Sequence, residues 1–295
     1  MMKGMDKDEA LITAVTTAIK QSKKYGDTSE ATIRQLAEEA ARQHKKPKAA
    51  IKAVRARLHS IMAPYLGDPD YAAMAQQLSE AFAHNDQDRI TQLCLASLDA
   101  HLSTRERLPI MADFYREIFA VTGQPQAILD IACALNPIAL RWMYPADSNV
   151  ATRPLGEQLS VNGNQLRFYA YDIHEPRIRF INHYFQLEGL EPLARVQDVA
   201  MHFPQEQADV ALFLKEMPRF TRNYGNLGRP LLQALNVRWL VISYPSVSTH
   251  GGRNLTNRYR DFMHKLIDGL PWPLTELLFD GELVFIIEKQ PKFVK

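Results

Sequence analysis

The segment ILDIACALNP at residues 128–137 governs how the rest of the chain is interpreted. Its first half is an apolar run broken only by Asp130, which is typical of a buried parallel strand that leads into a ligand-binding loop. A nucleotide-binding turn would place glycines in that loop, whereas this one has Ala132 and Ala134. The segment therefore predicts either a strand that holds a cofactor or an ordinary core strand.

Short apolar runs separated by helical stretches continue from residue 127 toward the end of the chain. Because helical stretches separate most of the first five runs, they predict a parallel sheet with right-handed crossovers. Asp280-Gly281 between the last two runs predicts a tight antiparallel hairpin. This α/β pattern outlines a class I (Rossmann-like) methyltransferase sheet, which binds S-adenosylmethionine. The predicted strands are Ile128–Cys133, Arg167–Ile173, Leu193–Val199, Val210–Leu214, Trp239–Tyr244, Glu276–Phe279 and Leu283–Glu288.

Acidic residues stand at the ends of three successive predicted strands. Ligands of open α/β sheets lie beyond the carboxyl ends of the strands, where an acid can accept hydrogen bonds from ribose hydroxyls. Asp130 belongs to the first strand and Asp172 ends the second, while Gln197-Asp198 is placed to meet an adenine. A helix cap is the alternative role for Asp172. Three acids in corresponding positions favour the cofactor.

Basic side chains gather near the N-terminus, although the whole chain carries a net charge of only +2. Residues 20–60 contain eleven Lys or Arg against four Asp or Glu. Such asymmetry predicts a basic helical module joined to a near-neutral one, with a polyanion as the partner of the basic part. Asp27-Thr28 is a candidate N-cap for a helix that continues to about His44, and Pro47 begins a second helix at a favoured position.

The second of these helices has one apolar and one cationic face. Lys48, Lys52 and Arg55 recur at i, i+4 and i+7 on the cationic face. A solvated surface is the ordinary interpretation, but such helices usually mix signs to form i,i+4 pairs. No Asp or Glu occurs from residue 40 to residue 67. The pattern favours an anion-binding face.

Two arginines precede the sheet in HLSTRERLP at residues 101–109. Ser103 and Glu106 match an S-x-x-E capping box, so this segment is a candidate helix start. Arg105 and Arg107 are also natural bidentate partners for a cofactor carboxylate. Both interpretations can hold together.

Composition excludes several classes of protein. Two cysteines, Cys94 and Cys133, are too few for a disulfide framework and lack the spacing of a zinc site, so we expect no metal. No stretch approaches the roughly 18 apolar residues of a membrane span, and the N-terminus lacks the apolar region of a signal peptide. We expect a cytoplasmic protein that does not bind membranes.

Several motifs together resemble one known family, the Arm/Rmt aminoglycoside-resistance methyltransferases. The resemblance spans roughly residues 20 to 288, and the joint occurrence of STRER with DIACALNP is specific. It implies methylation of guanosine N7 at the decoding A site of 16S rRNA, in the assembled 30S subunit. The matching segments are SKKYGDTSEATIRQL, HKKPKAAIKAVRARLH, APYLG, HLSTRERL, ILDIACALNP, YDIH, QDV, ALFLKEMP and ISYP.

The resemblance implies a role for each matching site residue. Arg107 would hold the carboxylate of S-adenosylmethionine, Ala132 and Ala134 its methionine part, Asp172 and Ile173 its ribose, and Asp198 its adenine. S-adenosyl-L-homocysteine would be the product. The full set of predicted cofactor residues is Arg107, Asp130, Ala132, Ala134, Asn136, Asp172, Ile173, Gln197, Asp198 and Leu214.

The family pattern also implies two domains and a monomer. Residues 1–105 would form a helical, basic rRNA-binding domain, and residues 106–295 the methyltransferase domain. Residues 144–164 are longer than in the family, and residues 246–259 keep Gly-Arg without the usual Gly-Met, which leaves the target nucleotide open. The predicted RNA contacts are Lys23, Lys24, Lys45, Lys46, Lys48, Lys52, Arg55, Arg57, Arg105 and Arg253.

No catalytic base is predicted, because guanine N7 already carries a free lone pair. The segment after the fourth strand, LKEMP, lacks the Asn/Asp-Pro-Pro-aromatic signature of amino-group methylation. Three alternatives remain: a methyltransferase of this fold that acts on another rRNA position such as a nearby adenosine, a catalytically silent RNA-binding protein, and a nicotinamide oxidoreductase. The last is disfavoured because no G-x-G-x-x-G follows the first strand.

Overall fold

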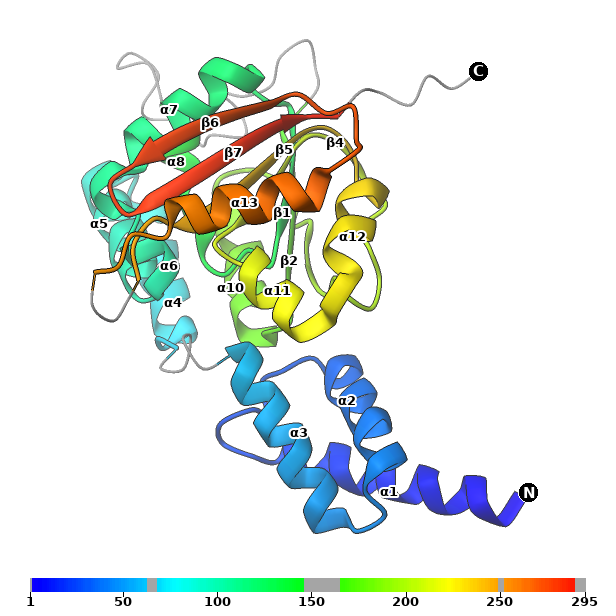
Figure 1. Cartoon of the computed structure of the whole chain (residues 1–295). Helices are drawn as coiled ribbons and strands as arrows, with labels where there is room; N and C mark the ends of the chain where they lie inside the picture. The colour runs from blue at the N-terminus through cyan, green and yellow to red at the C-terminus, as the bar shows by residue number, and fades with distance from the viewer. Residues whose placement is uncertain (1, 63–67, 146–164, 249–251, 290–295) are drawn as a thin grey trace.

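The computed structural model describes residues 2–62, 68–145, 165–248 and 252–289 (Figure 1). Seven strands form one sheet in the order β3-β2-β1-β4-β5-β7-β6. The first five are parallel, and β7 runs antiparallel to both of its neighbours. This confirms the predicted sheet and its terminal hairpin. The strands are β1 (Ala127–Ile131), β2 (Arg167–Asp172), β3 (Ala194–Val196), β4 (Gln207–Leu214), β5 (Asn236–Pro245), β6 (Leu274–Phe279) and β7 (Glu282–Glu288).

Helices cover both faces of this sheet, as its near-continuous apolar strands require. One face packs on α4 (Tyr71–Ala83), α5 (Gln87–Asp99), α7 (Met111–Thr122) and α10 (Glu175–Leu187). The other face packs on α11 (Met217–Tyr224), α12 (Gly228–Ala234) and α13 (Thr256–Ile267). Short helical segments complete the domain: α6 (Leu102–Arg105), η2 (Leu108–Ile110), η3 (Asn136–Ala139), α8 (Leu140–Met143) and η4 (Gly225–Leu227).

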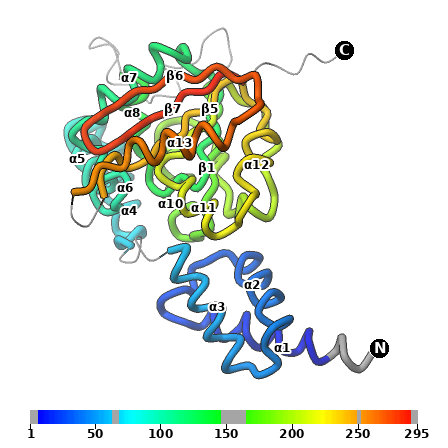
Figure 2. Tube along the Cα trace, in the orientation of Figure 1, coloured from blue at the N-terminus to red at the C-terminus, as the bar shows by residue number. Residues whose placement is uncertain are grey.

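Three N-terminal helices form a separate lobe with a core of its own, which we call the helical module (Figures 1 and 2). They are α1 (Met2–Lys20), α2 (Glu30–Gln43) and α3 (Pro47–Met62). Because α4 and α5 contribute to the core under the sheet, the packing favours a domain boundary near residue 62. The boundary at residue 105 stays a prediction.

The ends of these helices agree in part with the sequence analysis. Helix α3 begins at Pro47 as predicted, and α2 ends before His44. The N-cap of α2 is Ser29, not Asp27-Thr28, because the Ser29 side chain accepts a hydrogen bond from the Thr32 amide at 3.4 Å. Helix α1 was not predicted, although Leu11, Val15 and Ile19 are buried at a spacing of four.

Candidate functional site

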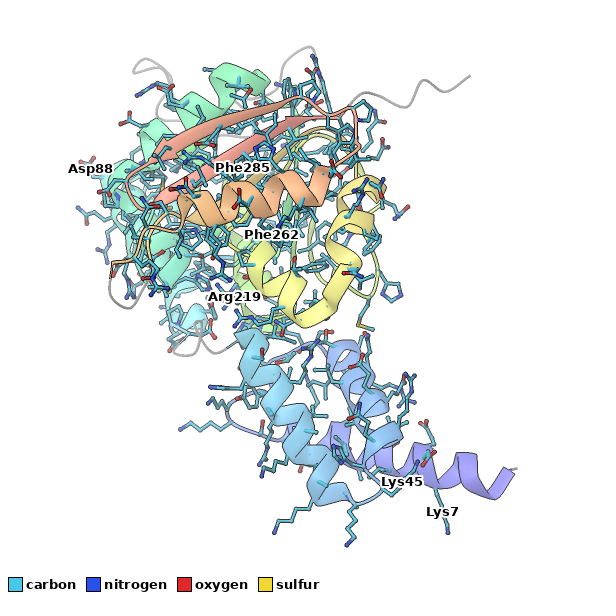
Figure 3. All side chains as sticks on the ribbon, viewed as in Figure 1. Lys7, Lys45, Asp88, Arg219, Phe262 and Phe285 are labelled. Atoms are coloured by element: carbon cyan, nitrogen blue, oxygen red, sulfur yellow. The ribbon has the colours of Figure 1, made fainter. Side chains whose placement is uncertain are left out.

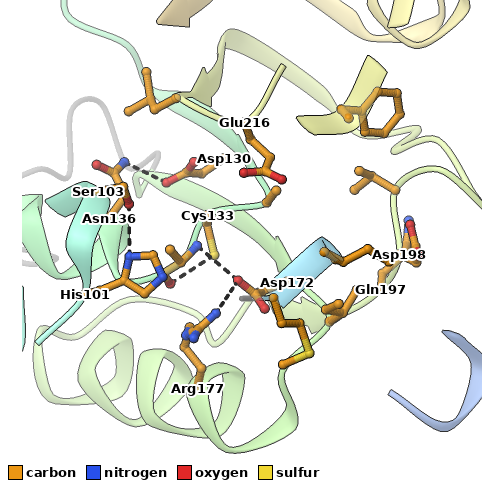
Figure 4. Close-up of a pocket in the computed structure, with 18 of the residues that line it drawn as sticks. His101, Ser103, Asp130, Cys133, Asn136, Asp172, Arg177, Gln197, Asp198 and Glu216 are labelled. Atoms are coloured by element: carbon orange, nitrogen blue, oxygen red, sulfur yellow. Dashed lines mark hydrogen bonds and ion pairs between the residues drawn. The ribbon is translucent and has the colours of Figure 1, made fainter. Parts of the chain in front are cut away.

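A cavity opens at the carboxyl ends of β1, β2 and β4. We call it the strand-end cavity. All ten predicted cofactor residues line it, from Arg107 to Leu214. Figure 4 shows Asp130 and Asp172 on its wall, between Asn136 on one side and Gln197 and Asp198 on the other. These residues come from the segment before η2 and from the ends of β1, β2, β3 and β4, so only the parallel sheet brings them together.

The loop after β1 has an unusual backbone. Ala132 and Ala134 adopt φ angles of 51° and 50°, in the left-handed region that usually requires glycine. The Ala134 amide donates to Asp172 Oδ2 at 3.1 Å, and the Cys133 amide donates to the carbonyl of Tyr171 at 2.9 Å. The loop is therefore held against the end of β2 by hydrogen bonds, in a conformation that lets a ligand approach the backbone.

Asp172 is fixed by three donors. It accepts hydrogen bonds from the amides of Ala134 and His174 and from Arg177 Nη1, the last at 2.9 Å. Asp172 does not cap α10, because the cap is the His174 ring, which accepts from the Arg177 amide at 3.3 Å. Arg177 is 4% exposed and continues to Asp68 at 2.8 Å, so the carboxylate sits in a buried ionic network.

A second buried network lies at the β1 end of the cavity. Asn136 donates to Asp130 Oδ2 at 2.8 Å and accepts from Arg107 Nη1 at 2.9 Å. Arg107 also forms a bidentate pair with Glu282, at 3.2 and 2.7 Å. Tyr115 is a further hydrogen-bond partner of this guanidinium, whose side chain is only 2% exposed. The contact of Arg107 with a ligand carboxylate stays a prediction.

Burial changes the protonation of Asp130. Loss of solvent raises the pKa of this carboxyl to about 8, although the hydrogen bond from Asn136 and the charge of Arg107 lower it. At neutral pH a large fraction of Asp130 is therefore protonated. A cationic ligand in the cavity would favour the charged form.

Asp198 lies at the opposite end of the cavity, beside an aromatic ring. Tyr224 donates its hydroxyl to Asp198 Oδ2 at 3.0 Å, and the Ala200 amide donates to Oδ1 at 2.9 Å. Burial raises the pKa of Asp198, and these two hydrogen bonds lower it. Gln197 is oriented by the His202 carbonyl, which accepts from Nε2 at 2.8 Å. This end of the cavity thus offers polar groups and a ring to a planar ligand.

The segment HLSTRERL is not a capping box. Helix α6 starts one residue before Ser103, with His101 at the N-cap position and no side-chain cap. Glu106 instead forms an ion pair with Lys215 at 2.8 Å, and Lys215 also contacts Glu282 at 3.3 Å. The prediction of a capping box is wrong because these tertiary ion pairs outcompete the local bond. Arg105 is exposed and pairs with Asp99 at 3.2 Å.

A second cavity adjoins the first and shares Ser103 with it. Lys215 lies in its wall with a φ of 59°, at the end of β4. Arg219 and Arg222 of α11 add two cations, and Tyr259 of α13 adds an aromatic ring. Cations beside an aromatic ring suit a nucleotide. The segment 246–259, expected near the target base, contributes Val247, Ser248 and Tyr259; residues 249–251 lie outside the described part.

The predicted RNA-binding residues divide into two groups. Nine of the ten are exposed, and Lys48, Lys52 and Arg55 share one face of α3. Lys45 pairs with Asp8 at 3.0 Å. Figure 3 shows Lys45 on the part of the helical module that points away from the sheet. Arg57 is half-buried against the sheet domain, where Nη1 donates to Asn223 Oδ1 at 3.1 Å. The structure thus separates Arg57 from the exposed cations.

Several lining residues were not identified from the sequence. His101 and Ser103 line the cavity from α6 and its N-cap, Arg177 from α10, and Tyr224 from α11. Ile61 and Met62 reach it from the end of α3. The sequence offered one signal for Arg177, which is an arginine five residues after Asp172. The other side chains lie far from the strand ends in sequence, so no local pattern indicated them.

The described residues contain neither a metal-binding cluster nor a membrane-spanning helix. Among them, no group of three or more His, Cys, Asp or Glu side chains is arranged to hold a metal ion. No helix among the residues that the structure describes is long and apolar enough to cross a bilayer. The resembling motif APYLG and nearly all of residues 144–164, an expected insertion, lie outside the described residues.

Comparison with known proteins assigns the chain to a family. A family model described as ribosomal RNA methyltransferase (FmrO) matches residues 21–286. The chain belongs to the FmrO family. The predicted recognition, fold and enzyme class are therefore confirmed.

Several relatives match most of the length of this FmrO-family chain. The 16S rRNA (guanine(1405)-N(7))-methyltransferase of Micromonospora echinospora is 29% identical, over 95% of this chain and 98% of its own. The enzyme of the same name from Serratia marcescens is 28% identical, over 92% and 96%. The crystal structure of RmtF with S-adenosyl-L-homocysteine is 26% identical and covers 95% of this chain and 98% of its own, with a TM-score of 0.74. RmtB gives a TM-score of 0.71 at the same identity and coverage.

Proposed function

We propose that this chain transfers a methyl group from S-adenosylmethionine to N7 of a guanosine in 16S rRNA. The target would lie at the decoding A site of the assembled 30S subunit, and its methylation would confer aminoglycoside resistance. The observation that carries this proposal is the strand-end cavity, lined by acids from three strand ends and joined to a second cavity whose lining includes Arg219, Arg222 and Tyr259. Relatives named as guanine-N7 methyltransferases of 16S rRNA support the choice of base.

The residues present fit S-adenosylmethionine. Asp172 faces the cavity with its orientation fixed by Arg177, as a carboxylate that accepts from ribose hydroxyls requires. The left-handed backbone at Ala132 and Ala134 allows close approach beside β1. Arg107 brings a positive charge to the cavity lining for a ligand carboxylate, and Asp130 offers a buried acid to a positive charge. The loop after β1 lacks the glycine motif that binds a nicotinamide cofactor, and this disfavours an oxidoreductase.

The proposed mechanism is one of positioning. S-adenosylmethionine supplies an electrophilic methyl group on a positively charged sulfur. The task of the chain is to hold guanine N7 in line with that methyl group, and orientation of this kind is worth up to about 7–11 kcal/mol. Arg219 and Arg222 would hold the phosphates of the target strand, and Tyr259 would contact the base. No residue need remove a proton from N7.

Access to N7 is the costly step. N7 lies in the deep major groove of A-form RNA, so the base must be distorted or flipped, at a cost of a few kcal/mol. Phosphate contacts by the exposed cations of the helical module would offset that cost. We propose that the protein acts as a cytoplasmic monomer on the subunit.

Methyl transfer to isolated 30S subunits tests the proposal. We expect radiolabel from S-adenosylmethionine in 16S rRNA, and borohydride and aniline treatment should then cleave the rRNA at one guanosine of the decoding site. Label without cleavage would point to another position, such as the nearby adenosine. Calorimetry with S-adenosyl-L-homocysteine separates the catalytically silent alternative, for which no heat of binding is expected. Cells that express the chain should tolerate raised concentrations of 4,6-disubstituted deoxystreptamines.

A further inference from the structure

The helical module reaches the strand-end cavity directly. Ile61 and Met62, the last two residues of α3, line it, although they belong to the lobe assigned to RNA. Met62 is 6% exposed and accepts a hydrogen bond from the Thr28 hydroxyl at 3.3 Å. The cavity is thus closed on one side by a lobe that has its own core and no share in the sheet.

Two sets of contacts hold this lobe in place, one on each side of the cavity. On the ribose side, the Ser29 amide donates to the Ile173 carbonyl at 2.7 Å and the Glu175 amide to the Asp27 carbonyl at 2.9 Å. Lys20 adds an ion pair with Glu175 at 3.1 Å. The backbone that follows Asp172 is therefore bonded to the loop between α1 and α2.

On the adenine side, the link is Arg57 of α3. Its guanidinium donates to both the side-chain and the main-chain oxygens of Asn223 and lies 5.4 Å from the centre of the Tyr224 ring. Ser60 donates to the same Asn223 side chain at 2.9 Å. Tyr224 in turn donates its hydroxyl to Asp198 at 3.0 Å. A continuous chain of contacts thus joins α3 to the acid at the adenine end.

We infer that the helical module completes the cofactor site, and that Arg57 is a positioning residue which holds Tyr224 and Asp198 for the cofactor. Arg57 therefore serves cofactor binding, whereas Arg55, exposed on the same helix, faces solvent. Because energetic coupling between two sites is reciprocal, a bound cofactor also stabilises the seating of the helical module that carries the RNA-binding cations. This inference rests on the proposed cofactor site and adds a link between cofactor and RNA domain.

Titration of the full chain with S-adenosyl-L-homocysteine by calorimetry tests the role of Arg57. We expect Arg57→Ala to weaken binding by about 5- to 20-fold, in the usual range for coupled sites. Arg57→Lys should restore only part of the affinity, because an ammonium lacks the planar fork that bonds Asn223 and covers the ring. Arg55→Ala is the matched control and should bind within about twofold of the wild type. Equal affinities for Arg57→Ala and Arg55→Ala would overturn the inference.

Hydrogen exchange gives a readout that loss of a merely structural contact would not reproduce. Ligand should slow exchange in α3 and α11 of the wild type, and this protection of α3 should disappear in Arg57→Ala while protection at the ends of β1 and β2 remains. Unchanged exchange in α3 of the wild type would contradict the coupling. If Arg57→Ala fails to fold, Tyr224→Phe removes only the bond to Asp198 and should also weaken binding. A wild type that binds no ligand would refute the proposed function as well.

Discussion

Ala132 and Ala134 show how single residues can meet a demand that usually falls to glycine. A left-handed backbone costs a residue with a Cβ roughly 1–2 kcal/mol. Here the bonds from the Ala134 amide to Asp172 and from the Cys133 amide to Tyr171 offset that cost. The loop after β1 therefore keeps the shape of a cofactor turn without the glycine motif.

At the same scale, the protonation of Asp130 should make stability depend on pH. Its pKa is raised to about 8 by burial, against roughly 3.9 in an unfolded chain. Between these values the native state holds a proton that the unfolded state releases, so its contribution to the free energy of unfolding falls as pH rises. The contribution is fully present below about pH 4 and lost by about pH 8.

Asp130→Asn should remove this dependence. We expect the stability of the variant relative to the wild type to increase by up to about 1.4 kcal/mol per pH unit between pH 5 and pH 7.5. Urea unfolding at several pH values measures it. Parallel profiles for the two proteins would show that Asp130 titrates normally.

At the scale of elements, strand β7 links the strand-end cavity to the second cavity through Glu282, which pairs with one residue of each. Glu282 at its start is 1% exposed and pairs with Arg107 and Lys215, which come from the segment before the sheet and from the end of β4. Glu288 at its other end pairs with Arg238, whose side chain is 64% exposed. The hairpin turn between β6 and β7 places Glu282, and Gly281 within it has a φ of 75°.

These two pairs on one strand should differ in their contribution to stability. Glu282→Gln leaves Arg107 with a buried charge and should lower the free energy of unfolding by about 3–5 kcal/mol. Glu288→Gln breaks an exposed pair and should cost less than about 1 kcal/mol. Denaturant midpoints measure both. Similar losses for the two variants would mean that burial does not set the strength of the Glu282 pairs.

The exposed cationic face of α3 is the part of the helical module that we predict to dock on RNA. Charge reversal of Lys48, Lys52 and Arg55 should abolish methylation of 30S subunits without weakening the binding of S-adenosyl-L-homocysteine, because these side chains are exposed. Radiolabelled methyl groups on filter-bound 30S subunits measure methylation, and calorimetry measures the binding of S-adenosyl-L-homocysteine.

The control makes the same change of charge elsewhere. Arg116, Arg179 and Lys265 are exposed on α7, α10 and α13 of the sheet domain. Their reversal should leave methylation of subunits largely intact. Unchanged methylation by the α3 variant would exclude RNA docking by that face.

At the scale of the whole molecule, the proposed RNA contacts and the proposed cofactor contacts differ in their exposure to solvent. The helical module presents exposed cations, whereas Arg107 and Arg177 beside the strand-end cavity are buried in ion pairs with Glu282 and Asp172. Salt screens exposed charges far more than buried ones. The two partners should therefore respond differently to ionic strength.

An increase from about 50 to 200 mM salt should weaken binding of 30S subunits by roughly 10³-fold or more, if six or more phosphates are contacted. Affinity for S-adenosyl-L-homocysteine should change by only a small factor over the same range. Both affinities can be measured on one preparation. A subunit affinity that does not vary with salt would be inconsistent with docking through the helical module.

Much of this architecture was accessible from periodicity and turn chemistry. All seven strands were predicted, because apolar runs of strand length and the Asp280-Gly281 turn are local signals. All ten predicted cofactor residues line one cavity, because parallel strands bring their carboxyl ends to one edge. The N-cap of α2 was misplaced, since neighbouring short polar side chains, here Thr28 and Ser29, compete closely for such a position. Helix α1 was missed, although Leu11, Val15 and Ile19 recur on its buried face at a spacing of four.

The amino-acid sequence alone was sufficient to establish the sheet, the cationic face of α3 and the acids at the strand ends, because each depends on neighbours within a few residues. Only the tertiary structure showed that Glu106 pairs with Lys215, that Arg107 pairs with Glu282, and that Arg57 joins α3 to the adenine end of the cavity. These contacts join residues more than 100 positions apart, and their energy depends on burial that exists only in the folded protein.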